Sequence, residues 1–306
     1  MTENILDNIH INFDSGSLWV MNIVLGLVMF GVALELSVSD FKPLWLRPKA
    51  LIAGLISQFL VLPAITFLLV LVIEPLPSIA LGMFMVAACP GGNISNFISY
   101  LSNANTALSV SLTAMATMFA IIMTPLNFHF WSMLYEPSSS LINEISISSI
   151  EMFKLVFLLL GLPLVLGMSI NYKMPELALK IAKKLKIVSL VFFIGLVFIA
   201  LYNNRIIFMD YILYVFWIVL AHNLLAFTTG YGIGKLFKLP VDSIRSITIE
   251  TGIQNSGLGL LLIFTFFDGL GGMALLAAFW GIWHIVSGLI LAAFWNRKSV
   301  AKETIA

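Results

Sequence analysis

Long apolar segments recur along the whole chain and restrict what it can fold into. The 306 residues are 60% hydrophobic and 10% charged, whereas a soluble domain carries about 25% charged residues. A helix needs about 20 apolar residues to cross a bilayer, and nine segments approach that length. They span residues 17–36, 50–72, 78–102, 105–127, 150–170, 187–203, 211–234, 242–267 and 272–295. The sequence therefore predicts an all-α polytopic membrane protein with about nine transmembrane helices surrounded by membrane lipid.

The basic residues lie mainly on one side of these segments. If the N-terminus is outside, the inner loops and C-terminal tail hold 14 of the 16 Lys and Arg residues, and only Lys154 and Arg205 fall near the outer face. Because positive loops stay in the cytoplasm, we expect a multi-pass protein of the cell inner (plasma) membrane. Residues 1–16 would form an outside tail and residues 296–306 a cytoplasmic tail. The dispersed basic residues argue against a nucleic-acid partner, and no obligate protein partner is evident.

Two of the nine segments contain helix-breaking residues. Pro90-Gly91-Gly92 lies in the middle of the third segment, and Gly252 and Gly257 bracket a polar cluster in the eighth. Proline removes a helix hydrogen bond, and the freed backbone groups must lie inside the protein or along a cavity. The broken segments are third in each of two sets, segments 1–4 and 6–9, which begin on opposite sides of the membrane. Such an inverted repeat with paired broken helices indicates a transporter with a binding site near the midplane.

The eighth segment also contains a carboxylate, Glu250, and no transmembrane segment supplies an obvious Lys or Arg partner. A charged residue at mid-membrane costs about 2.5–3.5 kcal/mol, which a bound cation would offset. Gln254 lies one helical turn after Glu250, Ser109 and Thr113 have the same spacing, and Gln58 lies in the middle of another segment. Hard cations prefer oxygen ligands, and this pattern therefore predicts a Na⁺ site.

The first break also suggests an anion site. A half-helix that begins after Gly92 would point the backbone N–H groups of Asn93 and Ile94 into the protein centre. A helix N-terminus carries partial positive charge and suits a carboxylate or sulfonate. The cation and anion sites together predict a Na⁺-coupled carrier of a small organic anion.

Three alternatives to such a carrier remain open. A proton-coupled organic-anion transporter would use Glu250 as the titrating group, and a Na⁺-dependent sensor would bind a ligand without moving it. An intramembrane hydrolase is the least favoured, because the sequence contains no GxSxG motif, no paired-Asp motif and no HExxH motif. We therefore expect no enzymatic activity and no catalytic residues.

Four motifs, CPGGNISN, ALSVSLTAM, IETGIQNSGL and WHIVSG, resemble in this order the bile acid:sodium symporter family, especially its bacterial members. The resemblance runs from MFGVALELSVSDF to WHIVSGLILAAFW, over nearly the whole chain. It implies that a core domain and a panel domain rock against each other, with the two broken helices crossing in the core. The panel would comprise residues 17–36, 150–170 and 187–203, and the core residues 50–127 and 211–295.

The resemblance also implies two coupling Na⁺ ions and a site for the substrate. The first Na⁺ site would comprise Ser95, Asn96, Ser109, Thr113 and Glu250. The second would comprise Gln58, Glu250 and Gln254 with the backbone carbonyls of Thr251 and Ile253. The substrate would lie between core and panel, near Asn93, Asn255 and His284.

Three departures from the family pattern concern the N-terminus and the substrate. Many bacterial relatives have a tenth helix at the N-terminus, which we expect this chain to lack. Asn93 stands where we associate a Thr with the family, and Ile285 follows His284 where some relatives have Asn. Both positions border the expected substrate cavity. The resemblance therefore leaves open whether the substrate is bile-acid-like or a smaller carboxylate such as pantoate or a keto acid.

Overall fold

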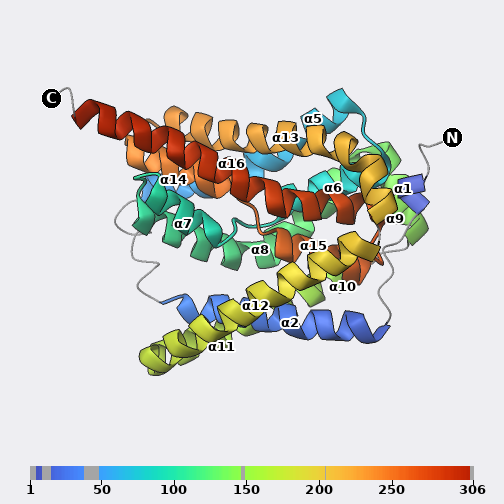
Figure 1. Ribbon diagram of the computed structural model, residues 1–306, viewed down its shortest axis with the longest axis horizontal. Coiled ribbons are helices and arrows are strands. Elements are labelled where there is room, and N and C mark those ends of the chain that lie inside the picture. The colour runs from blue at the N-terminus through green and yellow to red at the C-terminus, as the bar shows by residue number, and fades with distance from the viewer. Residues whose placement is uncertain (1–4, 9–14, 38–47, 146–148, 204, 304–306) are drawn as a thin grey trace.

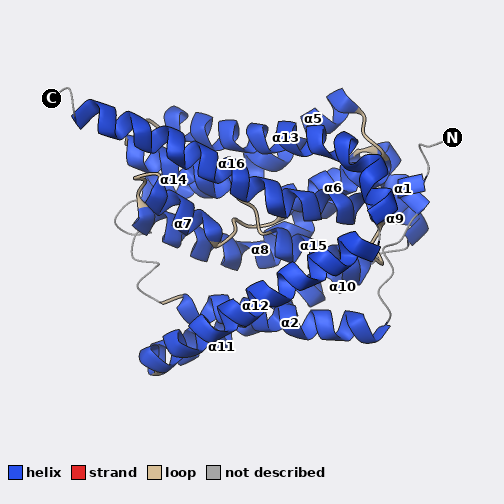
Figure 2. Cartoon of the chain, in the orientation of Figure 1, coloured by secondary structure: helices blue, strands red, loops and turns tan. Residues whose placement is uncertain are grey.

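The computed structural model describes residues 5–8, 15–37, 48–145, 149–203 and 205–303. These residues form helices joined by short loops, with no strand in the described ranges (Figure 1 and Figure 2). The predicted all-α class is confirmed. The inner loop with Lys42 and Arg47, most of the predicted outside tail and the last residues of the predicted cytoplasmic tail lie outside the described residues.

The first five predicted segments correspond to helices or pairs of helices. They are α2 (Ser15–Glu35), α4–η2–α5 (Pro48–Ile56, Ser57–Val61, Leu62–Ile73), α6 and α7 (Pro77–Ala88, Ile94–Leu101), α8 (Thr106–Leu134) and α10–η3–α11 (Ser149–Val156, Phe157–Gly161, Leu162–Lys173). The sequence analysis did not predict α1 (Ile5–Asn8) or α9 (Glu136–Ile145). α9 has the sequence EPSSSLINEI, which is too short and too polar for a search that requires long apolar runs.

The remaining helices are α12 (Pro175–Asn203), α13 (Arg205–Leu236), α14 and α15 (Val241–Gly252, Ser256–Phe266) and α16 (Gly271–Glu303). α12 begins at Pro175 rather than at the predicted residue 187. Its added turns are amphipathic, because Ala178 and Ala182 are buried whereas Lys183 and Lys184 are exposed. A proline is favourable in the first turn of a helix, and the exposed lysines interrupt the apolar pattern of these turns.

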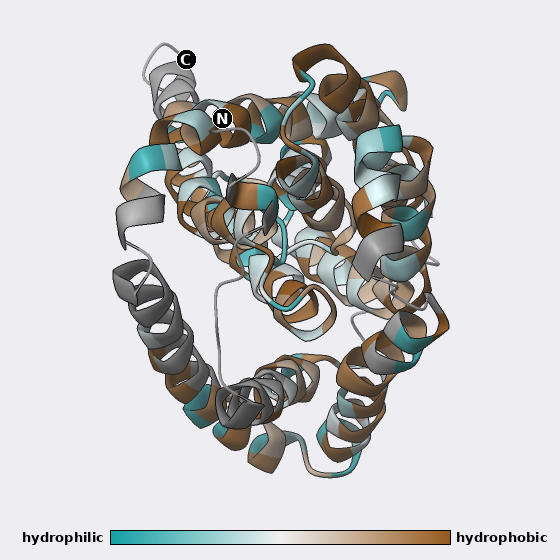
Figure 3. Cartoon of the chain, turned by 90° about the vertical axis from the view of Figure 1, so that its right-hand side faces the viewer, coloured by the Kyte–Doolittle hydropathy of each residue, from teal (hydrophilic) through white to brown (hydrophobic). Residues whose placement is uncertain are grey.

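Four helices in the described ranges are long and apolar enough to cross a membrane: Pro48–Ile73, Thr106–Leu134, Met209–Leu236 and Gly271–Asn296. The two broken helices do not meet this length because each half has between 8 and 12 residues. Hydrophobic residues predominate along the helices (Figure 3). The multi-pass membrane class is therefore supported, and both the count of nine crossing helices and the inverted repeat stay predictions.

A proline creates a π-helical turn in the second predicted segment. Pro63 has no N–H, so the carbonyl of Phe59, four residues earlier, lacks its usual helical partner. Asn127 of α8 donates its Nδ2–H to this carbonyl at 3.1 Å. The π-turn η2 contains Gln58, one of the predicted Na⁺ ligands, and such turns often occur at functional sites.

The helices form two groups in space. α2, α11 and α12 pack against one another and lie together along the lower side of Figure 1, an arrangement that Figure 3 also shows. Small residues permit this close packing: a Cβ added to Gly167 of α11 would lie 2.7 Å from the carbonyl carbon of Ala33 in α2. This group contains most of the predicted panel. A rocking motion between the two groups stays a prediction.

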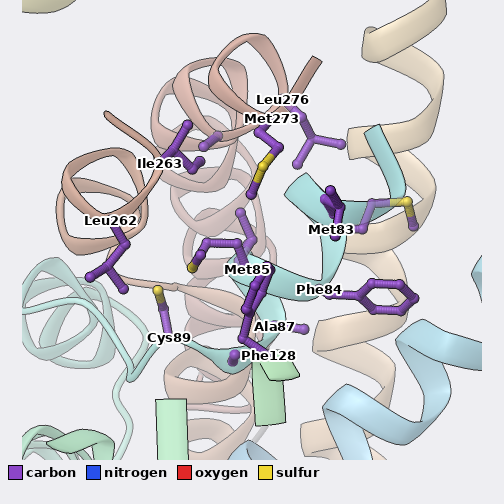
Figure 4. Close-up of a cluster of buried hydrophobic side chains, with 14 of the residues drawn as sticks. Met83, Phe84, Met85, Ala87, Cys89, Phe128, Leu262, Ile263, Met273 and Leu276 are labelled. Atoms are coloured by element: carbon purple, nitrogen blue, oxygen red, sulfur yellow. The ribbon is translucent and has the colours of Figure 1, made fainter. Parts of the chain in front are cut away.

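The larger group is built around α6, which is buried on all sides. Every residue from Ser78 to Ala88 is buried, as expected for a helix that is hydrophobic all round. Figure 4 shows Met83 and Met85 of α6 packed among Leu262 of α15, Met273 of α16 and other apolar side chains. α6 therefore gives the first broken helix a fixed position in the interior.

Candidate functional site

Both broken helices are interrupted where the sequence predicts. α6 ends at Ala88 and α7 begins at Ile94, while α14 ends at Gly252 and α15 begins at Ser256. Figure 2 shows the extended segments between these half-helices in the middle of the molecule. The predicted breaks are therefore confirmed.

The two extended segments cross and hydrogen-bond to each other through their main chains. Gly91 and Gln254 form an isolated antiparallel β-bridge. The Gly92 N–H donates to the Ile253 carbonyl at 2.7 Å, and the Asn255 N–H donates to the Pro90 carbonyl at 2.8 Å. Breaking a helix leaves backbone groups without partners, and here each break satisfies groups freed by the other.

Two glycines allow the segments to approach closely. A Cβ added to Gly91 would collide with the carboxylate of Glu250, and a Cβ added to Gly92 would lie 2.9 Å from the Gln254 carbonyl oxygen. Any larger side chain at residue 91 would therefore displace the carboxylate.

The five residues predicted for the first Na⁺ site lie together, and we call them the carboxylate cluster: Ser95, Asn96, Ser109, Thr113 and Glu250. The Ser95 hydroxyl lies 2.5 Å from Glu250 Oε2, and the Thr113 hydroxyl lies 2.9 and 3.0 Å from the two carboxylate oxygens. Asn96 Oδ1 lies 2.9 Å from the Ser109 hydroxyl and 3.2 Å from that of Thr113. Residues from α7, α8 and α14, far apart in the sequence, therefore converge on one carboxylate.

The carboxylate cluster is buried and presents oxygen atoms around one negative charge. Glu250 is 2% exposed, Ser95 and Ser109 are fully buried, and Asn96 is the most accessible of the five. In the described part of the chain, the hydrogen bonds to the Glu250 carboxylate come from the hydroxyl groups of Ser95 and Thr113. Oxygen donors with one uncompensated charge suit a hard monovalent cation, which would replace these hydrogen bonds when it binds.

The residues predicted for the second Na⁺ site form a neighbouring group, the glutamine cluster: Gln58, Thr251, Ile253 and Gln254. The side chains of Gln58 and Gln254 pair, with Gln58 Nε2 donating to Gln254 Oε1 at 2.8 Å. Gln254 Nε2 also donates to the Thr251 carbonyl at 2.7 Å, and Gln58 Nε2 to the Cys89 carbonyl at 2.7 Å. No hydrogen bond in the described ranges joins Glu250 to these side chains. A shared role for Glu250 in both sites stays a prediction.

The predicted substrate residues lie around the crossing. Asn93 directly precedes α7, and its side chain makes no capping hydrogen bond. Asn255 precedes α15, and its Oδ1 accepts the Leu258 N–H at 3.0 Å. His284 of α16 is buried, with its Nδ1 unpartnered within the described residues. It lies one turn beyond Gly281, where an added Cβ would be 2.8 Å from the Ser256 hydroxyl. α16 therefore brings His284 to the neighbourhood of the second break.

Several polar contacts around the crossing were missed by the sequence analysis. The hydroxyls of Ser57 and Thr251 lie 2.8 Å apart, although 194 residues separate them in the sequence. Asn127 satisfies the carbonyl of Phe59, and only that contact had a signal, because Pro63 predicts an unpartnered carbonyl four residues earlier.

Comparison with known proteins finds one family profile and several relatives. The profile of the Sodium Bile acid symporter family matches residues 22–211. The chain is 32% identical to the Bacillus subtilis protein named uncharacterized sodium-dependent transporter YocS, over 95% of this chain and 88% of that protein. It is 29% identical to the probable sodium/metabolite cotransporter BASS1, chloroplastic, of Arabidopsis thaliana, over 90% of this chain and 66% of that protein. It is also 29% identical to the human ileal sodium/bile acid cotransporter, over 78% of this chain and 67% of that protein.

Proposed function

The chain belongs to the sodium bile acid symporter family, and on this premise we propose that it carries a small organic anion together with two Na⁺ ions by alternating access. The family consists of sodium-coupled transporters rather than enzymes, so the chain is a sodium-dependent transporter. The number of ions, the substrate and the transport mechanism are the parts that we propose.

The convergence of hydroxyl and amide oxygens on Glu250 carries the proposal. The first Na⁺ would bind the carboxylate cluster, where the Ser95 and Thr113 hydroxyls now hold the carboxylate at 2.5–3.0 Å. Glu250 is 2% exposed, so its charge is costly without a counter-ion. The binding of Na⁺ neutralises the carboxylate and draws α7, α8 and α14 to a common ligand.

The second Na⁺ would bind the glutamine cluster. Gln58 and Gln254 each offer an amide oxygen, and the Thr251 carbonyl lies 2.7 Å from Gln254 Nε2. The Ile253 carbonyl accepts the Gly92 N–H in the crossing, so of the two predicted backbone ligands only Thr251 is held by a movable side chain. This difference favours Thr251 over Ile253 as the first carbonyl to reach an ion.

The substrate would be an organic anion, either bile-acid-like or a smaller carboxylate. Asn93 and Asn255 lie at the starts of α7 and α15, where helix N-termini carry partial positive charge. The Asn93 amide makes no capping bond and is free to bind a carboxylate. The relatives' names include both bile acid and metabolite cotransporters, which agrees with a substrate set by the residues at these positions rather than by the ion sites.

Alternating access would move α2, α11 and α12 as a panel against the other helices. Two Na⁺ ions entering with one monoanion move one net positive charge, worth about 2.3 kcal/mol per 100 mV. A tenfold Na⁺ gradient adds about 1.4 kcal/mol per ion. These terms together could drive an accumulation on the order of a few thousandfold. Such coupling requires that the ions favour the substrate-competent state. We place the protein in the cell inner membrane with its N-terminus outside and its C-terminus in the cytoplasm.

Thermal stability in NaCl and in choline chloride at equal ionic strength tests this proposal. We expect Na⁺ to raise the melting temperature of the wild type, because its binding adds about 2.7 kcal/mol to the free energy of unfolding when Na⁺ is a hundredfold above its dissociation constant. Glu250→Ala should remove this Na⁺-specific rise. No Na⁺ effect on the wild type, together with a pH-dependent stability, would instead support proton coupling through Glu250.

Substrate counterflow in proteoliposomes separates a transporter from a sensor. The wild type should exchange labelled anion across the membrane only in the presence of Na⁺. Na⁺-dependent anion binding without any counterflow would contradict the proposed transport.

A further inference from the structure

One face of α13 follows α14 up to the second break. The residues on this face are spaced by three or four positions: Asn223, Phe227, Gly230 and Gly234. A Cβ added to Gly230 would lie 2.7 Å from Thr248 Cα, and a Cβ added to Gly252 would collide with the Phe227 ring. α13 therefore packs directly on the backbone of α14 and ends this contact beside Gly252.

At the end of this contact, a buried amide holds the last carbonyl of α14. Asn223 Nδ2 donates to the Gly252 carbonyl at 2.8 Å, and Asn223 is only 1% exposed. The last carbonyls of a helix have no intrahelical partner, and in a membrane protein they cannot rely on water. The Asn223 amide therefore supplies the partner that the broken helix lacks.

The Gly252 carbonyl is the middle one of three carbonyls that bond to different elements. The Thr251 carbonyl accepts Gln254 Nε2 at 2.7 Å, and the Ile253 carbonyl accepts the Gly92 N–H at 2.7 Å. Because adjacent peptide units share the backbone dihedrals between them, fixing the middle carbonyl restricts the directions of both neighbours. The hydrogen bond from Asn223 to Gly252 thus restricts the direction of the Thr251 carbonyl indirectly.

Asn223 is itself held by α16. The Ser287 hydroxyl lies 2.6 Å from Asn223 Oδ1 and 3.2 Å from the His284 carbonyl. A hydroxyl has one hydrogen to donate, and the shorter distance assigns it to Asn223. Two hydrogen bonds therefore link Ser287 of α16, which lies one turn after His284, through Asn223 to the carbonyl of Gly252.

From these two hydrogen bonds we propose that Asn223, oriented by Ser287, is a positioning residue for the Na⁺ ion of the glutamine cluster. It sets the direction of the Thr251 carbonyl, and it links that ion to the helix that carries the predicted substrate residue His284. This inference rests on the proposed Na⁺-coupled function. It goes beyond that function because neither Asn223 nor Ser287 belongs to either ion site.

The test is the Na⁺ dependence of the melting temperature at constant ionic strength, for the wild type, Asn223→Ala and Asn171→Ala. Asn171 is a matched control, since its buried amide donates to the Leu34 carbonyl at 2.7 Å in the panel group. Both variants lose one buried hydrogen bond and should melt lower in choline chloride. Only Asn223→Ala should also raise the half-saturating Na⁺ concentration, by about tenfold, and make the Na⁺ dependence shallower as the two ions bind in separate steps.

Two substitutions at Ser287 test the same link more gently. Ser287→Ala should raise the half-saturating Na⁺ concentration by about threefold, and Ser287→Thr, which keeps the hydroxyl, should restore the wild-type value. These variants test the positioning role if Asn223→Ala does not purify as a folded protein.

The outcomes separate the positioning role from the proposed function. Wild-type Na⁺ dependence in Asn223→Ala or in Ser287→Ala, with melting lowered equally in both salts, would overturn the positioning role alone. A wild type whose melting temperature does not respond to Na⁺ would overturn the proposed function. The melting temperatures of all variants would then be independent of Na⁺ as well.

Discussion

The first broken helix, α6 with α7, and the second, α14 with α15, cross at the same point but contribute different chemistry. The first break contains Pro90, Gly91 and Gly92, and its glycines make room for the second extended segment. The second break begins at Ile253, after an α14 turn that holds Glu250, and it contains Gln254, so the second helix supplies a charge and an amide. The halves that precede the breaks differ as well, because α6 is almost wholly apolar, whereas the buried part of α14 includes Ser, Thr and Glu residues.

This difference shows why the two helices cannot share the same sequence at the crossing. A side chain on the first segment would occupy the place of the Glu250 carboxylate. Space and ligands must therefore come from different segments. An inverted repeat would give the two broken helices similar paths through the membrane. Sequence divergence between the two halves of the repeat would then leave glycines in one helix and ion-binding side chains in the other.

The largest expected effect comes from a side chain that occupies the space beside Gly91 in the first break. Gly91→Ala should displace the Glu250 carboxylate, lower stability by about 1–3 kcal/mol and weaken Na⁺ affinity on the order of a hundredfold. Na⁺-dependent thermal shifts of the purified variant measure both effects.

Gly259→Ala in α15 is the matched control, because the added Cβ would lie 3.6 Å from Cys89 Sγ, an ordinary contact. Alanine is favoured over glycine inside a helix by up to about 1 kcal/mol, so this variant should melt at or above the wild type. A wild-type Na⁺ response in Gly91→Ala would contradict the view that the first broken helix leaves the space that the Glu250 carboxylate needs.

A smaller effect is expected when the hydroxyl by which the first broken helix donates to the Glu250 carboxylate is removed. Ser95→Ala removes the bond to Glu250 Oε2 and should weaken Na⁺ affinity about tenfold. Ser102→Ala offers a comparison just beyond the end of α7, since the hydroxyl of the buried Ser102 donates to the Ile98 carbonyl of its own helix. Titration of the melting temperature with Na⁺ should separate the two variants. Equal half-saturating concentrations would show that the first helix contributes space alone.

The smallest expected effect concerns the residues that precede α7 and α15. Asn255 caps α15 through the Leu258 N–H, whereas Asn93 makes no capping bond. Without Na⁺ or anion, Asn255→Ala should lower stability by about 1 kcal/mol, and Asn93→Ala should leave the melting temperature almost unchanged. If the Asn93 and Asn255 side chains both contact the substrate anion, each variant should be stabilised less by that anion than the wild type is. An equal loss of stability in the two variants would contradict the difference in capping.

The breaks and Glu250 could be predicted because their signals are local, whereas Ser95 and Asn96 of the carboxylate cluster came from the family resemblance. Pro90 and its glycines interrupt a helix whatever surrounds them, and an unpaired Glu250 in an apolar segment requires a partner. The contacts of Asn223 with Gly252, and of Ser57 with Thr251, could not be predicted in this way. Each joins helices that are distant in the sequence, and an Asn or Ser in a membrane helix looks the same whether it holds a carbonyl of its own helix or of another.

The crossing is held by main-chain hydrogen bonds, from Gly92 to Ile253 and from Asn255 to Pro90, and this has a consequence for how such a carrier can change during evolution. Main-chain bonds survive when neighbouring side chains are exchanged. If Asn93 and Ile285 border the substrate, as the sequence predicts, substitutions there can therefore alter what is carried while the scaffold stays intact. A lineage could acquire a new cargo through a few point mutations, without first acquiring compensating mutations to preserve the fold.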